Sequence, residues 1–538
     1  MQRICVDLKE FKSIREQGGV YVDKTQYIYD IFGGGTYFFL ARPRRFGKSL
    51  LCTTLAELFE GNRELFKGLW IDNSDWKWTK HPVIRLDMSK AAAKTGTVET
   101  VRQGIINMLI NNAEKHGITD LEKNTPSLMF EQLIKKAHKT TGNKVVVTID
   151  EYDKPLLDVI DNPSQNAEIH KELSDFYSQL KPAEDNLRCV LITGVFKFTQ
   201  TSIFSGLNNL NDITFSPKAG ELLGYTEQEI KTFFAEHLNA LAIKHELPVE
   251  EMMSTLRKKY NGYRFGIDIG INKLSPGVYN PYALNYVFTE QQLLAKWFAS
   301  GSPTAMLKQL STEGFSGFDA KRLHVEFNTL NTSCSPADIT PISMLYYAGY
   351  MTMHDCYVDK DGEEPIAIIK LDFPSSEVRD AFAKNLLPEL LHKSADQISQ
   401  LAVRIKDIFR AQKIEKLQNV LNDLLSTATY EVFCRPYDSE PKENLYQIAF
   451  HCLFITANFR TVMEDTTNEG RIDITVELPD IVYLFELKMN RPATDAIQQI
   501  KDTEYPRKFK LTQKKVYGIG LSISSENRKI TELVYEIL

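Results

Sequence analysis

The chain has 538 residues, a formal net charge of −6, and 43% hydrophobic and 25% charged residues, which is ordinary for a globular protein. At roughly 150 residues per domain, this length allows about two to four domains. Because the net charge is negative, a nucleic-acid site has to be a local basic patch. The seven cysteines form no CxxC pair, which argues against a disulfide framework and against a zinc knuckle.

Residues 1–19 carry charges throughout and lack an apolar segment, so they do not have the pattern of a signal peptide. No apolar run approaches about 18 residues, the length that a transmembrane helix needs. We therefore expect a cytoplasmic protein that makes no membrane contact.

Short apolar segments alternate with helical patterns over the first part of the chain. The expected strands are 37–41, 83–87, 144–150 and 188–193, and the expected helices are 49–59, 97–114 and 128–139. Strands that alternate with helices predict a mainly parallel sheet, and thus an α/β fold.

The pattern changes after about residue 222. Expected next are amphipathic helices at 226–242 and 248–260, a helical stretch at 377–426, a helix at 442–455, strands at 460–464, 471–477 and 481–487, a helix at 493–504 and a strand at 515–522. We therefore divide the chain into a core, a helical lid with an intermediate region, a helical linker and a C-terminal α/β domain. The four parts span 1–222, 223–376, 377–429 and 430–538.

Residues 37–50, YFFLARPRRFGKSL, have the pattern of a P-loop. An apolar strand leads into a loop that contains Gly47, Lys48 and Ser49, and a helix follows. Loop N–H groups and the helix N-terminus hold phosphates, the lysine neutralises the β- and γ-oxygens, and the serine hydroxyl binds Mg²⁺. The segment therefore predicts an ATP site with Mg²⁺.

The loop departs from the usual pattern GxxxxGK[ST], because Arg42 stands where the first glycine belongs. Glycine eases a tight turn at this position, whereas arginine needs an ordinary backbone conformation. We therefore expect a differently shaped loop. Arg44 and Arg45 add positive charge near the phosphates.

A second half of the nucleotide site is expected about 100 residues downstream. The apolar strand in VVVTIDEYD ends at Asp150 and Glu151, where an aspartate would hold the Mg²⁺ shell and a glutamate would orient the attacking water. The next strand ends at Thr193, a candidate sensor of the γ-phosphate, with Lys197 as a second candidate. A degenerate site that binds nucleotide but barely hydrolyses it remains the alternative.

A second constellation lies in the C-terminal region. Asp473 lies in one expected strand, and Glu486 and Lys488 lie on one face of the next. Two carboxylates suit Mg²⁺ or Mn²⁺, and a neighbouring lysine can position water or stabilise a charged phosphate. Glu443 could complete the metal shell, and Gln499 follows in the next helix. The alternative is an edge strand that carries only a salt bridge.

Residues 505–515, YPRKFKLTQKK, contain five basic and no acidic residues, with Tyr505 and Phe509 between them. Basic residues interleaved with aromatic rings are typical of a phosphate-backbone patch. A solvated basic face is the alternative interpretation.

Several of these segments together resemble the AAA-ATPase-like family that is common in Bacteroidetes and other anaerobic bacteria. The segments are VYVDKT, RPRRFGKS, TIDEYD, TGVFKFTQTSIFSGLNNLNDIT, YNGYRFG, VYNPYAL, YYAGYMT and FPSSEVR. The segments GRIDITVE, YLFELK and AIQQI resemble the PD-(D/E)XK nuclease domain that is usually fused to that ATPase. The resemblance covers nearly the whole chain and implies a restriction-endonuclease-like α/β fold for the C-terminal domain.

The resemblance also implies roles for individual residues. The family tolerates arginine in place of the first P-loop glycine. Phosphate binding is implied for Gly47, Lys48 and Ser49, Mg²⁺ binding and hydrolysis for Asp150 and Glu151, and the nuclease centre for Asp473, Glu486 and Lys488, with Gln499 in the following helix. Relatives are expected to carry a lysine where this sequence has Thr503, so a helix lysine is not assigned to substrate contact.

We therefore hypothesise that an N-terminal ATPase regulates a C-terminal Mg²⁺-dependent nuclease that acts on DNA. One alternative is a signalling or defence ATPase that is switched by nucleotide and oligomerisation and uses the nuclease as its effector. Another is a module that binds nucleic acid or protein without cutting. A homo-oligomer is a further possibility. An arginine that acts across its subunits cannot be chosen from one sequence, and Arg264 is only a candidate within the lid region.

Overall fold

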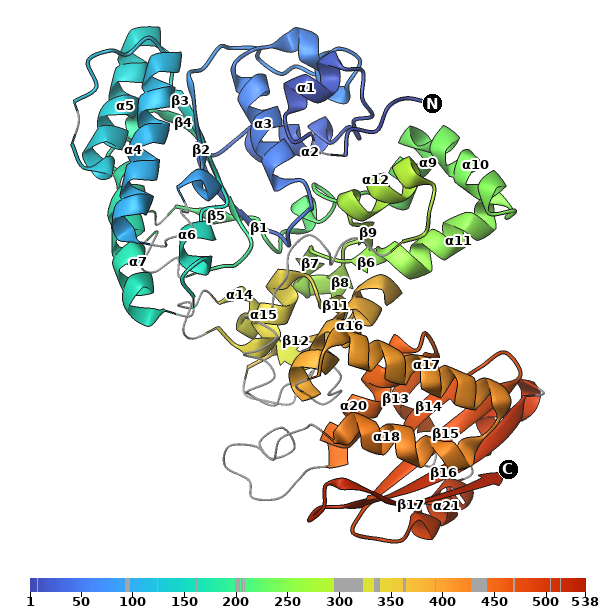
Figure 1. Cartoon of the computed structure of the whole chain (residues 1–538). Helices are drawn as coiled ribbons and strands as arrows, with labels where there is room; N and C mark the ends of the chain where they lie inside the picture. The colour runs from blue at the N-terminus through green and yellow to red at the C-terminus, as the bar shows by residue number, and fades with distance from the viewer. Residues whose placement is uncertain are drawn as a thin grey trace. The chain divides into compact units, whose positions relative to one another are not determined.

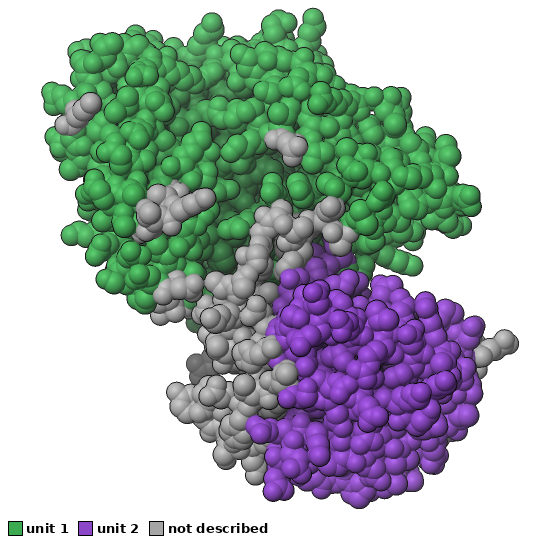
Figure 2. Space-filling model, viewed as in Figure 1, with its two compact units in different colours: residues 1–300, 323–376 green, residues 301–322, 377–538 purple. Residues whose placement is uncertain are grey.

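The structure is a computed structural model of the chain (Figure 1). It describes all residues apart from 7, 92–96, 123, 161, 199–203, 205–206, 208, 295–322, 333–338, 361–363, 392, 427–442, 468–469, 504 and 513. The domain boundary expected at 429–430 lies outside the described residues. The chain divides into two compact units (Figure 2), of which unit 1 comprises residues 1–300 and 323–376, and unit 2 comprises 301–322 and 377–538.

A five-stranded parallel sheet forms the centre of unit 1, and its strand order is β2-β3-β4-β1-β5. The strands are β1 (Tyr37–Ala41), β2 (Val83–Asp87), β3 (Val145–Asp150), β4 (Leu187–Gly194) and β5 (Asn211–Asp212). The apolar segments that predicted the first four strands are buried along nearly their whole length. The strand order places β4 between β1 and β3, so the carboxyl ends of the three strands meet at one edge.

Helices cover both faces of this sheet. Figure 1 shows α4, α5 and α7 on one side of the strands and α1, α2 and α3 on the other. The helices are α1 (Phe11–Glu16), α2 (Thr25–Phe32), α3 (Lys48–Phe59), α4 (Val98–Lys115), α5 (Pro126–Thr141), α6 (Lys154–Leu157) and α7 (Pro163–Tyr177). Thr97, Thr125 and Asn162 cap α4, α5 and α7 with their side chains, which satisfies free N–H groups of the first turns.

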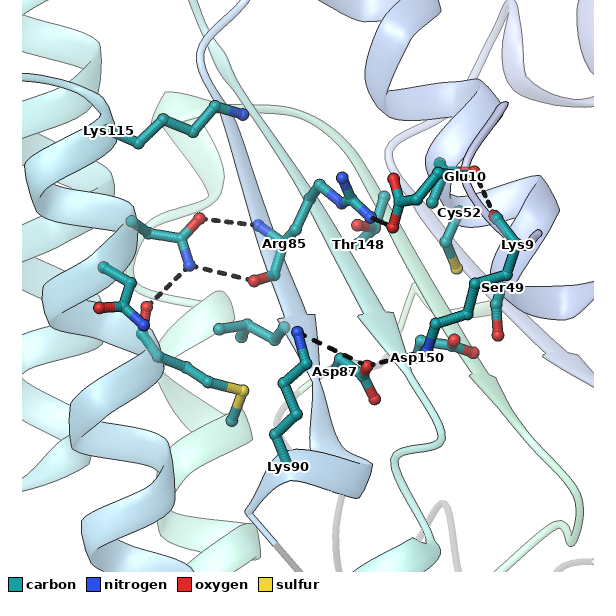
Figure 3. Close-up of a pocket in the computed structure, with 15 residues that line it drawn as sticks. Lys9, Glu10, Ser49, Cys52, Arg85, Asp87, Lys90, Lys115, Thr148 and Asp150 are labelled. Carbon is teal, nitrogen blue, oxygen red and sulfur yellow. Dashed lines mark hydrogen bonds and ion pairs between the residues drawn. The ribbon is translucent and has the colours of Figure 1, made fainter. Parts of the chain in front are cut away.

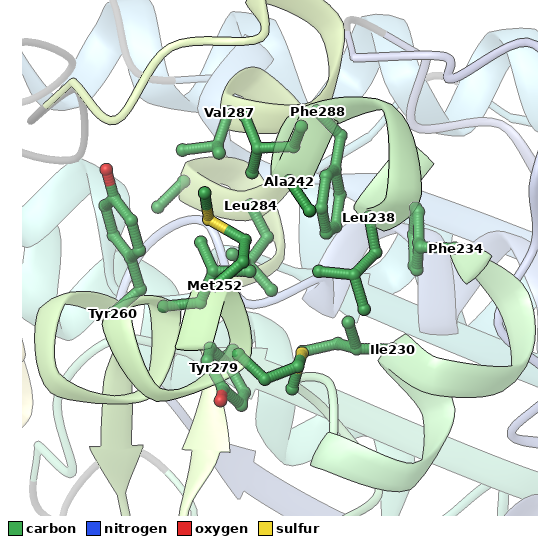
Figure 4. Close-up of a cluster of buried hydrophobic side chains, with 14 of the residues drawn as sticks. Ile230, Phe234, Leu238, Ala242, Met252, Tyr260, Tyr279, Leu284, Val287 and Phe288 are labelled. Atoms are coloured by element: carbon green, nitrogen blue, oxygen red, sulfur yellow. The ribbon is translucent and has the colours of Figure 1, made fainter. Parts of the chain in front are cut away.

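Four helices form the lid of unit 1 around an apolar cluster of their own (Figure 4). They are α9 (Glu227–Phe233), α10 (Ala235–Lys244), α11 (Val249–Tyr260) and α12 (Pro281–Glu290). The single helix expected at 226–242 is two helices, because Phe234 leaves the helical conformation at φ −118° and ψ 19°. Its ring stacks on Phe288 of α12, and Val22 of the N-terminal segment joins the same cluster.

Small antiparallel sheets complete unit 1. They consist of β6 (Asn261–Tyr263) with β9 (Val278–Tyr279), β7 (Ile267–Asp268) with β8 (Lys273–Leu274), and β10 (His324–Glu326), β12 (Ile366–Asp372) and β11 (Thr352–Asp359) in that order. Two helices, α14 (Phe327–Asn331) and α15 (Pro341–Ala348), accompany the last sheet.

Unit 2 is built on a mixed sheet of order β13-β14-β15-β16-β17, in which β15 and β16 are parallel and the other pairs antiparallel. The strands are β13 (Arg460–Thr467), β14 (Gly470–Glu477), β15 (Ile481–Met489), β16 (Lys515–Ser524) and β17 (Lys529–Ile537). The last strand was not expected from the sequence. Its solvent-facing residues are mostly polar, so it lacks the apolar run that marked the other strands.

The stretch 377–426 forms three helices, α16 (Ser376–Leu391), α17 (Ala395–Ala411) and α18 (Leu417–Leu425). Two further helices, α20 (Glu443–Thr456) and α21 (Ala493–Asp502), lie in the sequence before and between the strands of the sheet. A capping box of Ser394 and Gln397 begins α17, and Gln412 in the left-handed conformation ends it. The fold class is α/β, as the alternating patterns predict.

The described helices include none that is both long and apolar enough to cross a membrane. The five cysteines that the structure describes are free thiols.

Candidate functional site

The P-loop joins β1 to α3 at the carboxyl edge of the parallel sheet. Gly47 adopts φ 98°, a left-handed conformation that glycine reaches without strain, and α3 begins at the next residue. The Lys48 ammonium is buried and donates to the backbone oxygens of Arg42 and Pro43 at 2.9 and 3.0 Å. The lysine is thus held within the loop, where an incoming phosphate would take over its donors.

The P-loop opens onto a cavity of about 460 Å³, which we call the nucleotide pocket. Its walls include Arg44, Arg45, Gly47, Lys48, Ser49, Glu151, residues 20–22, Lys24, residues 222–225, Tyr282 and Asn285. The aromatic and apolar members among these offer a surface for a planar base, and the loop offers donors for its phosphates. The pocket volume suits a small-molecule ligand.

Sequence reasoning missed two aromatic residues of this pocket. Tyr225 and Tyr282 line it, and the Arg45 guanidinium lies 4.6 Å from the centre of the Tyr282 ring. Tyr282 lies in VYNPYAL, a segment that carried the family resemblance but suggested no role, and Tyr225 lies in none of those segments. The missing signal is tertiary, because the N-terminal segment, the lid and the P-loop are far apart in sequence.

Asp150 and Thr193 are brought together by neighbouring strands. Thr193 Oγ1 donates to Asp150 Oδ1 at 2.7 Å, and both side chains are buried. Glu151 follows in a left-handed conformation at φ 52°, which is strained for a residue with a side chain. Ser49 and Asp150 also line a second cavity of about 410 Å³ beside β2, the β2 pocket (Figure 3). These oxygens fit the ligand preference of Mg²⁺.

Arg42 keeps a negative φ, unlike Arg45 at φ 68°, and its side chain turns into the core. Its guanidinium donates to the backbone oxygens of Ala41, Thr214 and Ala219 at 2.6 to 3.0 Å. It also lies 4.4 Å from the centre of the Phe265 ring. The residue in place of the usual glycine therefore anchors the loop to the segments behind it.

Restoring the glycine, Arg42→Gly, is expected to destabilise unit 1 by roughly 2–4 kcal/mol, because three buried carbonyl groups lose a charged donor. The change would show as a lower midpoint in urea unfolding. Arg44→Gly is the matched control, since Arg44 is exposed in the same loop, and it should move the midpoint little. Equal effects of the two changes would contradict the anchoring role.

Asp153 is fully buried three residues after Asp150. Its Oδ2 accepts hydrogen bonds from the N–H groups of Val195 and Phe196 at 2.9 and 2.8 Å. Burial raises the pKa of Asp153 to about 6, although these N–H groups and the Lys48 charge lower it. Asp153 thereby ties the turn after β3 to the turn after β4, the two turns that carry Glu151 and follow Thr193.

Because the folded pKa of Asp153 is raised from 3.8 to about 6, its contribution to stability is complete below pH 3.8 and is lost as the pH rises through about 6. Between pH 5 and pH 7.5 this loss should amount to about 1 kcal/mol. Asp153→Asn should remove this pH-dependent loss of stability, whereas the exposed control Asp175→Asn should keep it. Urea unfolding at both pH values measures the loss, and an unchanged pH dependence in Asp153→Asn would contradict the prediction.

Two other candidates from the sequence have protein partners. Lys197 is buried and bonds Asp212 Oδ2 at 2.6 Å and the Asn331 side chain at 2.9 Å. These contacts give it a structural partner on β5 rather than a free ammonium. The Arg264 guanidinium donates to the backbone oxygen of His354 at 3.1 Å.

The C-terminal constellation lies where β14 and β15 separate. The two strands pair from Glu477–Val482 to Ile474–Phe485, and Asp473 is the next residue. Its Oδ2 accepts a 2.7 Å hydrogen bond from the N–H of Leu487. The aspartate carboxylate thus replaces a strand partner and is fixed at the point where the sheet opens.

Glu486 and Lys488 lie on one face of β15, as their spacing predicts. The Lys488 ammonium donates to Glu486 Oε1 at 3.0 Å. Glu443 at the start of α20 accepts from the N–H of Met489 at 3.2 Å. Burial raises the pKa values of Asp473, Glu486 and Glu443, and the neighbouring carboxylates raise the first two further. The ionised forms of these carboxyl groups are therefore unfavourable unless a positive charge compensates them.

A divalent cation would supply the positive charge that the ionised carboxylates need. Glu486 Oε2 is buried and meets no hydrogen-bond donor among the described residues. Within that part of the chain no three His, Cys, Asp or Glu side chains form a ready-made metal cage, so Glu443 does not close one with the other two. Mg²⁺ is commonly held by one or two carboxylates together with water and substrate phosphate. Asp473 and Glu486 can supply such a pair.

The other C-terminal candidates are placed differently. Gln499 is half-buried on α21, and no hydrogen bond among the described residues joins its side chain to the carboxylates. Thr503 Oγ1 bonds the backbone oxygen of Gln499 at the end of that helix.

The expectation that Tyr505 and Phe509 belong to a nucleic-acid patch is wrong. Both rings are buried in an apolar cluster with residues of β14, β15 and α21, because the basic segment covers that cluster. Lys514 pairs with Glu477, and Lys515 lies opposite Ile481 in the parallel register, whereas Gly520 lies opposite Glu486. Five residues of strand, about 17 Å, separate this end from the carboxylates.

Comparison with known proteins agrees with this geometry. A family model described as "Predicted AAA-ATPase" matches residues 5–204, and one described as "PD-(D/E)XK nuclease superfamily" matches residues 441–533. The chain is 32% identical over 541 residues to "Uncharacterized protein in vnfD 5'region" of Azotobacter chroococcum mcd 1, covering 100% of this chain and 99% of that protein.

Two solved structures share 10% identity with the chain. The match to the Aeropyrum pernix ORC1 protein in complex with DNA spans 70% of this chain and 91% of that chain, with a TM-score of 0.23. The Aeropyrum pernix ORC2 protein in ADPNP-ADP complexes covers 72% and 95%, with a TM-score of 0.21. Similarities this low carry no argument about this chain.

The two family matches define an AAA-ATPase joined to a nuclease domain, as the motifs predict. The chain therefore belongs to the family of predicted AAA-ATPases that carry a C-terminal PD-(D/E)XK nuclease-superfamily domain, and the Azotobacter protein is a full-length relative. The domains indicate ATPase and nuclease activities, and such domains generally use a nucleotide and divalent metal ions.

Proposed function

We propose that this protein is an ATP-controlled nuclease that cuts DNA, with the N-terminal ATPase regulating the C-terminal centre. The observation that carries the proposal is that one chain contains both a P-loop pocket and a splayed strand end. Lys48 and Ser49 line the P-loop pocket, Ser49 and Asp150 line the adjoining β2 pocket, and Asp473 and Glu486 lie at the strand end. A protein that only bound nucleic acid would need neither a buried P-loop lysine nor neighbouring carboxylates at a strand end.

In the ATPase, we assign phosphate binding to Gly47 and Lys48, Mg²⁺ binding to Ser49 and Asp150, and water orientation to Glu151. Arg44, Arg45 and Thr193 complete the set, the last as the γ-phosphate sensor through its bond to Asp150. Mg²⁺ would neutralise charge on the β- and γ-phosphates. The strained backbone at Glu151 supports this role, because strain at a strand end is common in active sites.

In the nuclease, we assign the metal to Asp473 and Glu486, with Glu443 beside them, and the phosphate contact to Lys488. A bound Mg²⁺, or Mn²⁺, would polarise the scissile phosphodiester and activate water. Lys488 would release Glu486 to the cation and turn its ammonium toward the substrate phosphate. Gln499 on α21 would contact the substrate or the attacking water.

The proposal includes the parts expected from the sequence, namely a core at 1–222, a lid and intermediate region at 223–376, a linker at 377–429 and a nuclease domain at 430–538. Nucleotide would act first on the lid, because lid residues and the P-loop share the nucleotide pocket. We further propose that the protein acts in the cytoplasm, where its DNA substrate and ATP are present.

The test is cleavage of a panel of single- and double-stranded DNA and RNA by the purified chain, with and without ATP and Mg²⁺. Metal- and ATP-dependent cleavage of DNA is the expected result. Cleavage that ignores ATP would remove the regulatory part of the proposal, and a preference for RNA would replace the substrate.

Two alternative functions predict different results, one for the oligomeric state of the purified chain and one for the cleavage panel. A change of oligomeric state on nucleotide binding would favour a switch that uses the nuclease as its effector. Binding of DNA without cleavage under any metal would favour a non-cleaving module.

A further inference from the structure

Lys9 precedes α1 and has no motif around it, yet it lies beside the ATPase site. Among the described residues, it is the cation of the β2 pocket that also lines the nucleotide pocket. Figure 3 shows its side chain running past Ser49 toward Asp150 and Asp87. Lys9 therefore stands where the phosphate end of the nucleotide pocket meets the β2 pocket.

The backbone of Lys9 is fixed to the helix of the P-loop. Thr53 Oγ1 on α3 donates to the Lys9 backbone oxygen at 3.0 Å and accepts from the N–H of Phe11 at 3.1 Å. Thr53 and Phe11 are buried. The side chain of Lys9, by contrast, is 59% exposed. Its ammonium can therefore move while its backbone stays fixed to α3, the helix that begins with Lys48.

Two lysines share one carboxylate at this place. Asp87 Oδ2 lies 3.3 Å from the Lys9 ammonium and 3.9 Å from that of Lys90. Asp87 is the register partner of Asp150 across β2 and β3. Two ammonium groups therefore face one carboxylate beside Asp150, and Lys90 can still neutralise Asp87 if Lys9 leaves.

The other cations of the β2 pocket have carboxylates of their own. Arg85 bonds Glu10 at 2.8 Å and Lys115 bonds Glu60 at 2.5 Å. Burial lowers the pKa of Lys9, but the charges of Asp87, Asp150 and Glu151 outweigh it and raise the pKa above its usual value. Lys9 is thus held in its charged form, and its carboxylate partner Asp87 is shared with Lys90.

We infer that Lys9 is a further catalytic residue of the ATPase, whose ammonium exchanges Asp87 for the terminal phosphate of ATP bound to the same chain. The inference rests on the proposed ATPase site. During hydrolysis the water oxygen bonds to the γ-phosphorus while the bond to the β,γ-bridging oxygen breaks. ADP leaves with that electron pair, Glu151 accepts the water proton, and Lys9 keeps its protons and stabilises the charge on the transferred phosphoryl group.

The test is steady-state ATP hydrolysis by the full chain carrying Lys9→Gln, with Lys90→Gln as the control that shares Asp87. Lys9→Gln should lower kcat about 100-fold, the size expected for one lost charged donor, while the Kd of a non-hydrolysable ATP analogue changes less than about tenfold. Lys9→Arg should restore part of kcat, and Lys90→Gln should stay within about twofold of the unaltered chain. An unchanged kcat in Lys9→Gln, or an equal loss in both glutamine variants, overturns the inference.

Mixing decides whether Lys9 acts within its own chain. An excess of Lys48→Ala, which retains Lys9, should not restore hydrolysis to Lys9→Gln, and restoration would overturn action within the chain. If the unaltered chain itself hydrolyses no ATP, the proposed ATPase function fails. If it is active while Lys9→Gln is equally active, only the inference about Lys9 fails.

Discussion

Replacing Lys48 with alanine is expected to lower ATP hydrolysis by about 100-fold or more, because one buried charged donor to the β- and γ-phosphates is lost. Binding of ATP should weaken as well, since the ammonium contacts the ground state. If the ATPase controls the nuclease, the nucleotide dependence of DNA cleavage should disappear in the same variant. Hydrolysis and cleavage are measured on one preparation, with and without ATP.

The Lys48 ammonium also holds the backbone oxygens of Arg42 and Pro43, so alanine could loosen the loop. Lys48→Gln separates the two effects, because an amide can still donate to a loop carbonyl but carries no charge. The matched control is Lys154→Ala, a lysine that lines the same pocket and pairs with Asp158. A Lys48→Gln variant with normal hydrolysis, or cleavage that keeps its ATP dependence, would contradict the proposed roles.

Replacing Asp473 with asparagine is expected to reduce nuclease activity by about 100- to 1,000-fold while ATP hydrolysis continues. The asparagine oxygen can still accept the N–H of Leu487, so the strand end should keep its shape. The lost charge weakens the hold on the divalent cation. The control is Asp480→Asn, an exposed aspartate at the turn of the same hairpin, and it should cleave normally.

A second measurement is independent of cleavage. Asp473 lies near the carboxylates of Glu486 and Glu443, so its removal relieves repulsion and should leave the midpoint of unfolding unchanged or raise it without metal. Mg²⁺ should stabilise the unaltered chain, because a ligand that binds the folded state raises its stability. It should stabilise Asp473→Asn less. Equal stabilisation of both would place the cation elsewhere.

Much of the fold could be predicted from local pattern. The strands 37–41 and 83–87 were predicted at their observed ends because both are buried apolar runs that end at polar loops. The same local logic failed for β17, where polar and apolar side chains are mixed and most of the exposed ones are polar. It also failed at Phe234, where ring packing within the lid, a tertiary interaction, breaks the helix.

The candidate residues divide in the same way. Sequence by itself determined which residues could form the two proposed sites, because Gly47, Lys48 and Ser49 follow a strand, and Glu486 and Lys488 share a strand face. These patterns depend on neighbours a few residues apart, which local geometry places directly.

Only the tertiary structure decided what depends on distant segments. In the tertiary structure Arg42 is buried and holds the loop through backbone oxygens. Tyr505 and Phe509 are buried in an apolar cluster and cannot contact nucleic acid, and Tyr225 and Tyr282 line the nucleotide pocket. The tertiary structure also brought Lys9 to Asp87, 78 residues away. Such contacts arise where hydrophobic burial packs separate elements together, and no local periodicity records which elements will meet.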